Sequence, residues 1–375
     1  KVLGKALFWD VAVSSDGQTA CASCHFHAGV DVRTKNQLSP ALNHQAGAPK
    51  NSTFDPTLSG NRGGPNYRMQ PEDFPFFVLA DPNKRDSAIV FQTDDVMSSQ
   101  GVFSTQFVGA TAGADNDQCN FVFDGRYHVG GVSTRRVEPR QTPTIINAVF
   151  NLRNFWDGRA NETFNGVNPF GMRDPNAGIY QVSSQGNSIV KVQPNLTFSS
   201  LASQAVGPPT NSFELACAGR VWPNVGRRLL NRIPLQNQAV AANDSLLGDY
   251  RAASGLGLNQ TYQQLIDQAF AAAYRNNGWQ VSINGAQYTL SEANFSFFFG
   301  IAVQLYESTL VSDDAPLDQY ITGSNLSALN EQEIRGMNLF AGKGKCTACH
   351  SGPQLTNAGT PAIRDFLEGA IVSHM

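Results

Sequence analysis

Apolar residues with a helical period make the second half of the chain its more regular part. In Gln263–Tyr274 the apolar side chains lie three or four positions apart, and Ser291–Leu310 repeats this spacing with several phenylalanines. Residues at such spacing share one face of an α-helix, so both stretches are predicted to be helices that pack through that face. A third helix is predicted to begin at Asn330, which can cap it, and to end at Gly342.

The first half of the chain is richer in turn-forming residues. A short helix is predicted over Leu3–Asp10, but residues 13–70 are dominated by Gly, Pro, Asn and Ser, which favour loops. Residues 175–260 are interpreted as an insertion that covers a functional site or docks a donor protein. The expected fold class is therefore mainly α, with long loops and an insertion.

Composition and charge exclude several classes of protein. Hydrophobic residues make up 41% of the 375 residues and charged residues 15%, which argues against a disordered chain. The formal net charge of −3 gives no overall basic field, so nucleic acid is not expected as a partner. The sequence contains no run of about 18 apolar residues, so no membrane span is predicted.

Two C-x-x-C-H motifs carry the strongest chemical signal in the chain. They are Cys21-Ala22-Ser23-Cys24-His25 and Cys346-Thr347-Ala348-Cys349-His350. The two thiols of such a motif lie one helical turn apart and can add to the two vinyl groups of a haem, while the adjoining histidine binds the iron. A zinc ribbon would need its cysteine pairs about 15–20 residues apart, and a thioredoxin-type pair would need a βαβ context. Two covalently bound haems c are therefore predicted, with His25 and His350 as iron ligands.

The doubled motif predicts two related cytochrome c-like haem domains. We place them at residues 1–215, together with a loop-rich insertion, and at residues 216–375. The chain starts at Lys1 rather than at methionine, and only 25 residues follow His350. We therefore expect the chain to be part of a longer protein, with an incomplete C-terminal domain.

Two cysteines, Cys119 and Cys217, lie outside the haem motifs. Haem of this type is attached outside the cytoplasm, where disulfides can persist, so a bond between these two residues is predicted. Two buried free thiols are the alternative, since the sequence does not give their geometry. The same argument predicts that the protein is periplasmic or secreted.

Three further side chains are candidates for roles beside a haem. His44 could bind an iron from its distal side, although a lone histidine is more often a polar surface residue. Trp156 could lie between the two haems and help to carry electrons, although a tryptophan more often belongs to a core. Arg159 could hold a haem propionate through a bidentate contact, or form an ordinary salt bridge.

Beyond these motifs, the chain resembles the bacterial di-haem cytochrome c peroxidases and their MauG-like relatives. The stretches that carry the resemblance follow the family's order along most of the chain: Leu3–Asp10, Thr142–Asn147, Phe155–Ala160, Tyr306–Asp318 and Leu329–His350. The resemblance implies two mainly helical domains that face each other across a calcium-bearing interface, and family members are often homodimers.

The resemblance also assigns different roles to the two haems. It implies that the haem of His25 meets hydrogen peroxide, and that the haem of His350 accepts electrons from a small donor protein, a cytochrome c or a cupredoxin. The family's tryptophan between the haems corresponds to Trp156.

Two positions depart from the family's pattern. Its peroxidases carry a glutamate over the reactive haem, in an N-P-V-E-M-like stretch, where a carboxylate can move a proton between the peroxide oxygens. The matching stretch, Asn168–Met172, has Gly171 at that position, beside the bulky Phe170. An apolar pocket of this kind resembles the rubber-oxygenase branch, whose haem binds oxygen and cleaves an alkene. The family's calcium-binding asparagine is replaced by Gln141, whose side-chain carbonyl can still bind the ion.

Three functions remain open at this point. A peroxidase that uses a small donor protein is the leading hypothesis, and it rests on the family-wide pattern and Trp156. An oxygenase, or a MauG-like oxidase of a larger substrate, is favoured by Phe170, Gly171 and the expected insertion. A di-haem cytochrome that only transfers electrons is the third hypothesis, and it predicts low-spin spectra for both haems in every redox state.

Overall fold

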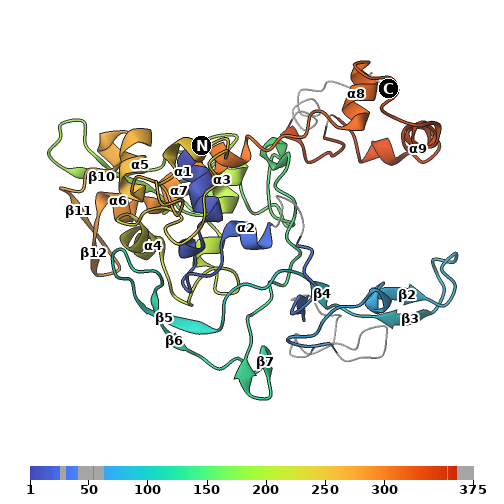
Figure 1. Cartoon of the computed structure of the whole chain (residues 1–375), viewed down its shortest axis with the longest axis horizontal. Coiled ribbons are helices and arrows are strands. Elements are labelled where there is room, and N and C mark those ends of the chain that lie inside the picture. Colours follow the sequence, from blue (N-terminus) through green and yellow to red (C-terminus); the bar gives the residue numbers. More distant parts are fainter. Residues whose placement is uncertain (26–30, 41–53, 55–62, 353, 361–375) are drawn as a thin grey trace.

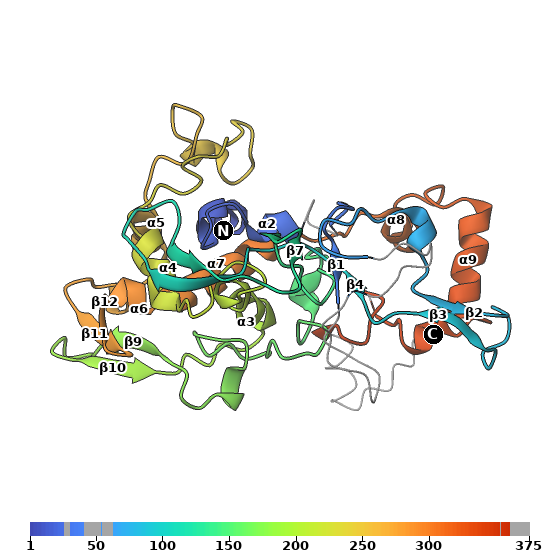
Figure 2. The same cartoon turned by 90° about the horizontal axis from the view of Figure 1, so that it is seen from below.

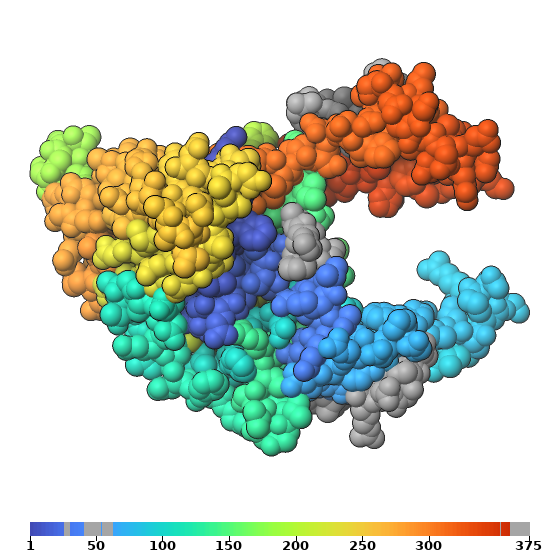
Figure 3. All heavy atoms as spheres, viewed as in Figure 1, coloured from blue at the N-terminus to red at the C-terminus, as the bar shows by residue number. Residues whose placement is uncertain are grey.

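The computed structural model describes residues 1–25, 31–40, 54, 63–352 and 354–360. Figure 1 shows a helical body from which two extensions project: a C-terminal lobe that carries the second haem motif, and an arm built from a β-hairpin. Figure 3 shows an open space between these extensions on one face of the molecule. The first haem motif lies in the body, close to the N-terminus of the chain.

The helices of the described residues are α1 (Val2–Trp9), α2 (Cys21–Cys24), α3 (Ser200–Ala205), α4 (Trp222–Leu229), α5 (Tyr262–Ala269), α6 (Leu290–Ala293), α7 (Phe295–Glu307), α8 (Pro316–Thr322) and α9 (Glu331–Ala341). Short 3₁₀ turns, such as Ala148–Phe150 and Cys346–Ala348, lie between them.

The strands of the described part pair only two by two, always antiparallel. The pairs are β1 (Leu38–Ser39) with β4 (Val96–Met97), β2 (Phe77–Leu79) with β3 (Ile89–Gln92), β5 (Thr105–Gly109) with β6 (Gln118–Phe121), β7 (His128–Val129) with β8 (Val132–Ser133), β9 (Ile179–Val182) with β10 (Ile189–Val192), and β11 (Gln280–Ile283) with β12 (Ala286–Thr289). The main hydrophobic cluster is built mostly by helices, and every strand pair except β1 with β4 joins strands that follow each other in the sequence.

Most of the predicted helices are confirmed with small changes at their ends, but the helix predicted over Ser291–Leu310 is divided at Asn294 into α6 and α7. α5 ends at Ala269, and a separate 3₁₀ turn follows it within the range predicted as one helix. α9 begins where the sequence indicated, because the side chain of Asn330 accepts hydrogen bonds from the backbone N–H groups of Gln332 and Glu333. α1 covers the predicted helix near the N-terminus.

Helix α7 is the centre of the core because it is apolar on nearly all sides. Its residues Phe295, Phe298 and Phe299 are fully buried, and each stabilises the fold by roughly 1.5–3 kcal/mol relative to an exposed side chain. α1, α3 and α4 pack along α7. α1 comes so close that a Cβ on Gly4 would overlap the carbonyl group of Ala302, so this contact requires glycine.

Asp10 connects the end of α1 to a segment more than two hundred residues away. Its carboxylate is buried and accepts hydrogen bonds from the backbone N–H of Ala12, the backbone N–H of Leu235 and the hydroxyl of Tyr262, all at 2.8 Å. This contact fixes the direction in which the chain leaves α1 toward the first haem motif.

The segment expected to be an insertion, residues 175–260, is partly a component of the core. α3 and α4 lie within it, and Leu201, Val225 and Leu229 belong to the main hydrophobic cluster. Whether the segment covers the site or docks a donor protein stays a prediction. The β9–β10 hairpin of the same segment does project from the body, at the end opposite α8 and α9 (Figure 2).

The C-terminal lobe contacts the body at the 3₁₀ turn Ala148–Phe150 and at the residues that follow this turn. The backbone N–H of Leu152 donates to the carbonyl of Ala358, and the hydroxyl of Thr360 donates to the carbonyl of Phe150. The hydrophobic cluster of the body contains residues from both sides of position 215. The division into haem domains at 1–215 and 216–375 stays a prediction.

Cys119 and Cys217 form a disulfide, as predicted, so the alternative of two free thiols is excluded. The bond ties β6 to the segment that leads into α4. The same region contains a buried ion-pair group, in which the carboxylate of Asp117 pairs with Arg220 at 2.8 Å and with Arg228 at 3.0 Å. All three side chains are completely shielded from solvent.

Candidate functional site

The first haem motif places both thiols and the histidine on one helical turn. Cys21 and Cys24 are the first and last residues of α2, and the backbone N–H of His25 still bonds to the carbonyl of Cys21 at 3.0 Å. The Nδ1 atom of His25 lies 3.0 Å from the carbonyl oxygen of Pro143. A carbonyl only accepts a hydrogen bond, so Nδ1 carries the proton and Nε2 is left to bind a metal.

Burial keeps this histidine neutral. Removal from water lowers the pKa of His25 to about 4, although the hydrogen bond to Pro143 opposes the shift. A neutral imidazole is the form that binds iron. Burial also raises the pKa of both thiols, that of Cys24 to about 12, which is typical of cysteines that sit inside a pocket.

A pocket of about 950 Å³, including its open mouth, lies beside the motif and fits the haem that the motif predicts. Both thiols and His25 line it, together with the apolar side chains of Phe8, Ile145, Leu215 and Val303. Arg140 and Arg159 supply two positive charges on its wall, as two haem propionates require. The residues present therefore fit a covalently bound haem.

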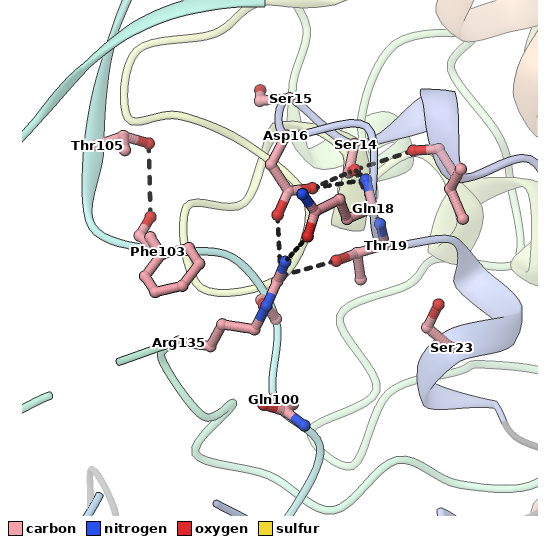
Figure 4. A network of polar contacts seen from close by, with 12 residues as sticks. Ser14, Ser15, Asp16, Gln18, Thr19, Ser23, Gln100, Phe103, Thr105 and Arg135 are labelled. Atoms are coloured by element: carbon pink, nitrogen blue, oxygen red, sulfur yellow. Dashed lines mark hydrogen bonds and ion pairs between the residues drawn. The ribbon is translucent and has the colours of Figure 1, made fainter. Parts of the chain in front are cut away.

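The loop that leads into the motif is held from outside by Arg135. Its guanidinium group pairs with Asp16 at 2.9 Å and donates hydrogen bonds to the side chains of Gln18 and Thr19, as Figure 4 shows. The hydroxyl of Ser23 accepts from the backbone N–H of Ala20 and so caps α2. These contacts fix the position of the two thiols relative to the pocket.

Trp156 and Arg159 both lie on the pocket wall. The indole Nε1 of Trp156 donates a hydrogen bond of 2.8 Å to the backbone carbonyl of Gln141. Arg159 lies over the ring of Phe155 at 3.9 Å and pairs with Asp157 at 2.9 Å. Arg140 pairs with the same carboxylate, and although burial opposes the effect, hydrogen bonds from both arginines lower the pKa of Asp157 to about 2.

The second haem motif repeats the local arrangement of the first. The Nδ1 atom of His350 lies 3.0 Å from the carbonyl oxygen of Leu355, as that of His25 does from Pro143. In each motif a phenylalanine from the preceding helix has its ring centre 6.0 Å from the histidine ring: Phe8 for His25 and Phe340 for His350. Cys346, Cys349 and His350 are exposed in the described structure.

A family model described as di-haem cytochrome c peroxidase matches residues 1–63 and 110–326, which is more than half of the chain. The chain belongs to the di-haem cytochrome c peroxidase family. The family match runs through residues 175–260 and leaves residues 64–109 and 327–375 outside. The internal part of the chain outside the match is therefore the arm that contains β2 and β3, and the C-terminal part outside it contains the second haem motif.

The individual proteins that the chain is similar to include cytochrome c peroxidases and MauG. The cytochrome c551 peroxidase of Pseudomonas aeruginosa is 26% identical over 217 residues, which are 58% of this chain and 38% of that protein. The cytochrome c peroxidase Ccp of Escherichia coli is 24% identical over 233 residues, 60% of this chain and 31% of that protein. The methylamine utilization protein MauG of Methylorubrum extorquens is 44% identical over 50 residues, 13% of this chain and 14% of that protein. The chain spans less than half the length of these relatives.

Several predicted site residues lie away from the pocket or outside the described residues. Phe170 is 45% exposed and is not one of the residues that line the pocket of His25. Gly171 has a φ of +57°, and a Cβ there would lie 2.5 Å from the carbonyl oxygen of Thr163, so a larger side chain does not fit this backbone. Glu162, a nearby acid that was not predicted as a site residue, pairs with Arg153. His44 lies outside the described residues.

The calcium site has weaker support than the haem sites. Gln141 lines the haem pocket and a small neighbouring cavity, and its backbone carbonyl is bonded to Trp156. Within the described ranges, no group of three or more His, Cys, Asp or Glu side chains could hold a metal ion. In the same part of the chain, no helix is long and apolar enough to cross a membrane.

Three acids on the pocket wall, Glu138, Glu214 and Glu307, were not singled out from the sequence. Glu214 and Glu307 have neutral or apolar neighbours in the sequence, whereas Glu138 lies among three arginines, and no spacing indicates a shared role. Glu307 closes α7, is 6% exposed and has its pKa raised to about 8 by burial. Its place in the family-like stretch Tyr306–Asp318 is the one sequence feature that could have drawn attention to it.

Proposed function

We propose that this chain is the catalytic part of a di-haem enzyme that reduces hydrogen peroxide with electrons from a small donor protein, a cytochrome c or a cupredoxin. The observation that carries the proposal is the position of residues 150–159. Phe150 and Leu152 bond to the segment just after His350, and Trp156 lines the pocket of His25. One short stretch of backbone therefore connects the pocket of the first haem motif with the segment that follows the second motif.

The residues beside the haem motifs would have different roles in the reduction of peroxide. A bound haem supplies the iron chemistry that breaks the peroxide bond. The hydrogen bond to the Pro143 carbonyl fixes the orientation of the His25 ring and leaves Nε2 as the atom that would bind the iron. Arg140 and Arg159 would bind the propionates, and Trp156 would shorten the path for electrons that arrive at the His350 haem.

A second candidate is an oxygenase or a MauG-like oxidase of a larger substrate. The specific observation in its favour is Gly171, whose backbone leaves no room for the glutamate that the family's peroxidases carry. The exposed side chain of Phe170 would then face a substrate at the edge of the site. A non-enzymatic electron-transfer cytochrome is a third candidate, and it would need a protein ligand on each distal side, for which His44 is the candidate at the first haem.

Steady-state turnover tests the proposal. The haem-loaded protein is poised half-reduced and mixed with hydrogen peroxide and a reduced small cytochrome c, and donor oxidation is followed by absorbance. Saturable donor oxidation that depends on peroxide supports a peroxidase. If peroxide produces no turnover while alkene or aromatic substrates are oxidised under oxygen, the enzyme is an oxygenase.

The remaining proposals concern the setting of the enzyme. Covalent haem attachment and the Cys119–Cys217 disulfide both support a periplasmic or secreted location. Calcium near Gln141 and a homodimer are proposed from the family alone, and two haem domains divided near residue 215 are proposed from the doubled haem motif.

A further inference from the structure

Three aromatic side chains lead from the histidine of the first haem motif to the surface. The ring centre of Phe8 lies 6.0 Å from that of His25 and 5.4 Å from that of Tyr306. The ring centre of Trp9 lies 6.2 Å from that of Phe8, and its Nε1 atom donates a hydrogen bond of 3.0 Å to the hydroxyl of Tyr306. We call Phe8, Tyr306 and Trp9 the aromatic row. Each member contacts the next directly.

The aromatic row runs from the interior to solvent. Phe8 is 1% exposed and Tyr306 5% exposed, whereas Trp9 is 39% exposed. Electron tunnelling slows steeply with distance, so closely spaced rings carry an electron through a packed interior faster than one long step. Indole and phenol rings can lose an electron to a strong oxidant, and a phenyl ring cannot. Trp9 and Tyr306 are therefore the redox-active members, and Phe8 bridges the gap to His25.

Trp9 is held at the surface in a neutral environment. The side-chain amide of Gln238 donates to the carbonyl of Trp9 at 2.8 Å and accepts from the backbone N–H of Val11 at 2.9 Å. Lys5 is the one charged side chain of α1 and lies one helical turn before Trp9. Its ammonium group pairs with Asp244 at 2.7 Å. The helix therefore offers no unpaired charge beside the exposed indole, which suits a neutral aromatic reductant.

The second haem motif repeats only the inner part of this arrangement. Phe340 lies against His350 with the two ring centres 6.0 Å apart. The residue after this phenylalanine is Ala341, whereas the residue after Phe8 is Trp9. An oxidisable side chain at this position therefore distinguishes the first haem motif from the second.

We propose that Trp9 is a second oxidation site, which takes electrons from small neutral phenols and passes them along the aromatic row to the pocket of His25. This inference rests on the proposed function, because hydrogen peroxide is the oxidant. Reduction of one hydrogen peroxide breaks its O–O bond and takes up two electrons and two protons, which gives two waters. Each phenol loses one electron and one proton and becomes a phenoxyl radical, so two phenols balance one peroxide.

Trp9 gives one electron to the row in each step and regains it from a phenol at the exposed edge of its ring. Its Nε1 proton stays in the hydrogen bond to Tyr306, since a phenol oxygen is a weak base. Burial raises the pKa of Tyr306, so its hydroxyl keeps its own proton as well. The proton of the oxidised phenol passes to water. The donor protein delivers its electrons through the His350 haem, so the two routes can be tested separately.

Turnover with guaiacol, a small neutral phenol, tests the site. The haem-loaded protein is mixed with hydrogen peroxide and guaiacol, and the coloured product is followed by absorbance. In a parallel series a reduced small cytochrome c replaces guaiacol. Trp9→Phe and Tyr306→Phe are compared with Trp279→Phe, a control that replaces a tryptophan away from the haem pocket.

We expect Trp9→Phe to oxidise guaiacol at least about tenfold more slowly than the wild type, which is the effect of about 1.4 kcal/mol on the activation barrier. Tyr306→Phe should lose less, because the indole still contacts Phe8. Trp279→Phe keeps the wild-type rate. Cytochrome c oxidation stays at the wild-type rate in Trp9→Phe, since those electrons enter at the His350 haem.

Radical trapping locates the oxidised side chain without turnover. One equivalent of hydrogen peroxide is added to the haem-loaded protein with a nitroso spin trap and no reductant, and peptide mass spectrometry maps the adduct. We expect the adduct on Trp9 in the wild type, less of it on Trp9 in Tyr306→Phe, and none on Trp279. Equal haem content and unchanged absorption spectra in all variants separate these effects from misfolding.

Guaiacol oxidation at the wild-type rate in Trp9→Phe would overturn the inference, because the phenol would then react elsewhere. The absence of an adduct on Trp9 in the wild type would overturn it as well. The proposed function fails separately, if the wild type does not oxidise cytochrome c with peroxide while guaiacol oxidation still depends on Trp9.

Discussion

The indole Nε1 of Trp156 donates a 2.8 Å hydrogen bond to the backbone carbonyl of Gln141. This bond joins two stretches that the family shares, and it holds the ring at the wall of the His25 pocket although 69% of the side chain is exposed. Gln141 is followed directly by the segment whose Pro143 carbonyl orients His25. The tryptophan is therefore connected to the proximal histidine through two hydrogen bonds and two residues of backbone.

Replacement of Trp156 by phenylalanine tests its role in electron delivery. Trp156→Phe removes the hydrogen bond and part of the ring system, so we expect electron transfer to the His25 haem to slow at least about tenfold, while both haems stay attached. Stopped-flow absorbance after mixing with peroxide measures this rate. Trp279→Phe is the matched control, since Trp279 does not line the pocket. An unchanged rate in Trp156→Phe would remove this residue from the path.

Restoring a side chain at Gly171 should damage the fold rather than improve catalysis. Gly171 and Gly130 both have a φ of +57°, but a Cβ at Gly130 meets no atom within 4 Å. Gly130→Ala should therefore lower the free energy of unfolding by about 1–2 kcal/mol through backbone strain. Gly171→Ala should lower it by about 1–3 kcal/mol more, because its side chain would also be overpacked. Denaturant unfolding measures the difference. Equal losses at the two positions would show that the site near Thr163 has room for a larger residue.

Glu307 should make the protein less stable as pH rises. Its pKa is about 8 in the folded chain and near its ordinary 4.5 when unfolded, so the unfolded state loses its proton first. Between these values the free energy of unfolding falls by at most about 1.4 kcal/mol per pH unit. Glu307→Gln cannot lose a proton at this position, so its free energy of unfolding should not show this fall. The difference in free energy of unfolding, variant minus wild type, should therefore rise from pH 5 to pH 8. Glu331→Gln, on the surface of α9, should show no such trend, and a flat difference for Glu307→Gln would contradict the prediction.

The buried ion pairs of Asp117 should be essential for the fold. Asp117→Asn leaves Arg220 and Arg228 without their carboxylate in a region closed to solvent, which should cost about 3–5 kcal/mol. Asp115→Asn is the control, because Asp115 is largely exposed where it pairs with Arg232, and its loss should cost less than about 1 kcal/mol. Urea unfolding of the haem-loaded variants compares the two. Similar costs for both substitutions would mean that the buried pairs add no stability.

Short sequence patterns predicted the parts of the structure that depend only on residues close together in the sequence. The two haem motifs, the cap at Asn330 and the long apolar helix around Phe298 are set within a few positions of the sequence, and the structure has them where they were expected. The disulfide was predicted on weaker grounds, from the cellular compartment and from the two remaining cysteines, and it is confirmed.

Contacts between segments that lie far apart in the sequence could not be predicted from such short patterns. α4 carries two adjacent arginines, which are typical of a solvent-exposed helix face, but Arg228 is fully buried because Asp117 neutralises it. Glu138 and Glu214 reach one wall only through the packing of the whole body. The crowding around Gly171 likewise depends on Asn161 and Thr163, and glycine alone does not reveal it.

A single-turnover measurement tests most directly whether the two haem motifs form one electron path. The fully reduced, haem-loaded protein is mixed without oxygen with one equivalent of hydrogen peroxide, and the absorbance of both haems is followed with time. Two-electron reduction of the peroxide predicts that both haems become oxidised, the His350 haem through the segment that contains Trp156. If the His350 haem stays reduced while peroxide is consumed, or if neither haem reacts, the proposed peroxidase path is contradicted.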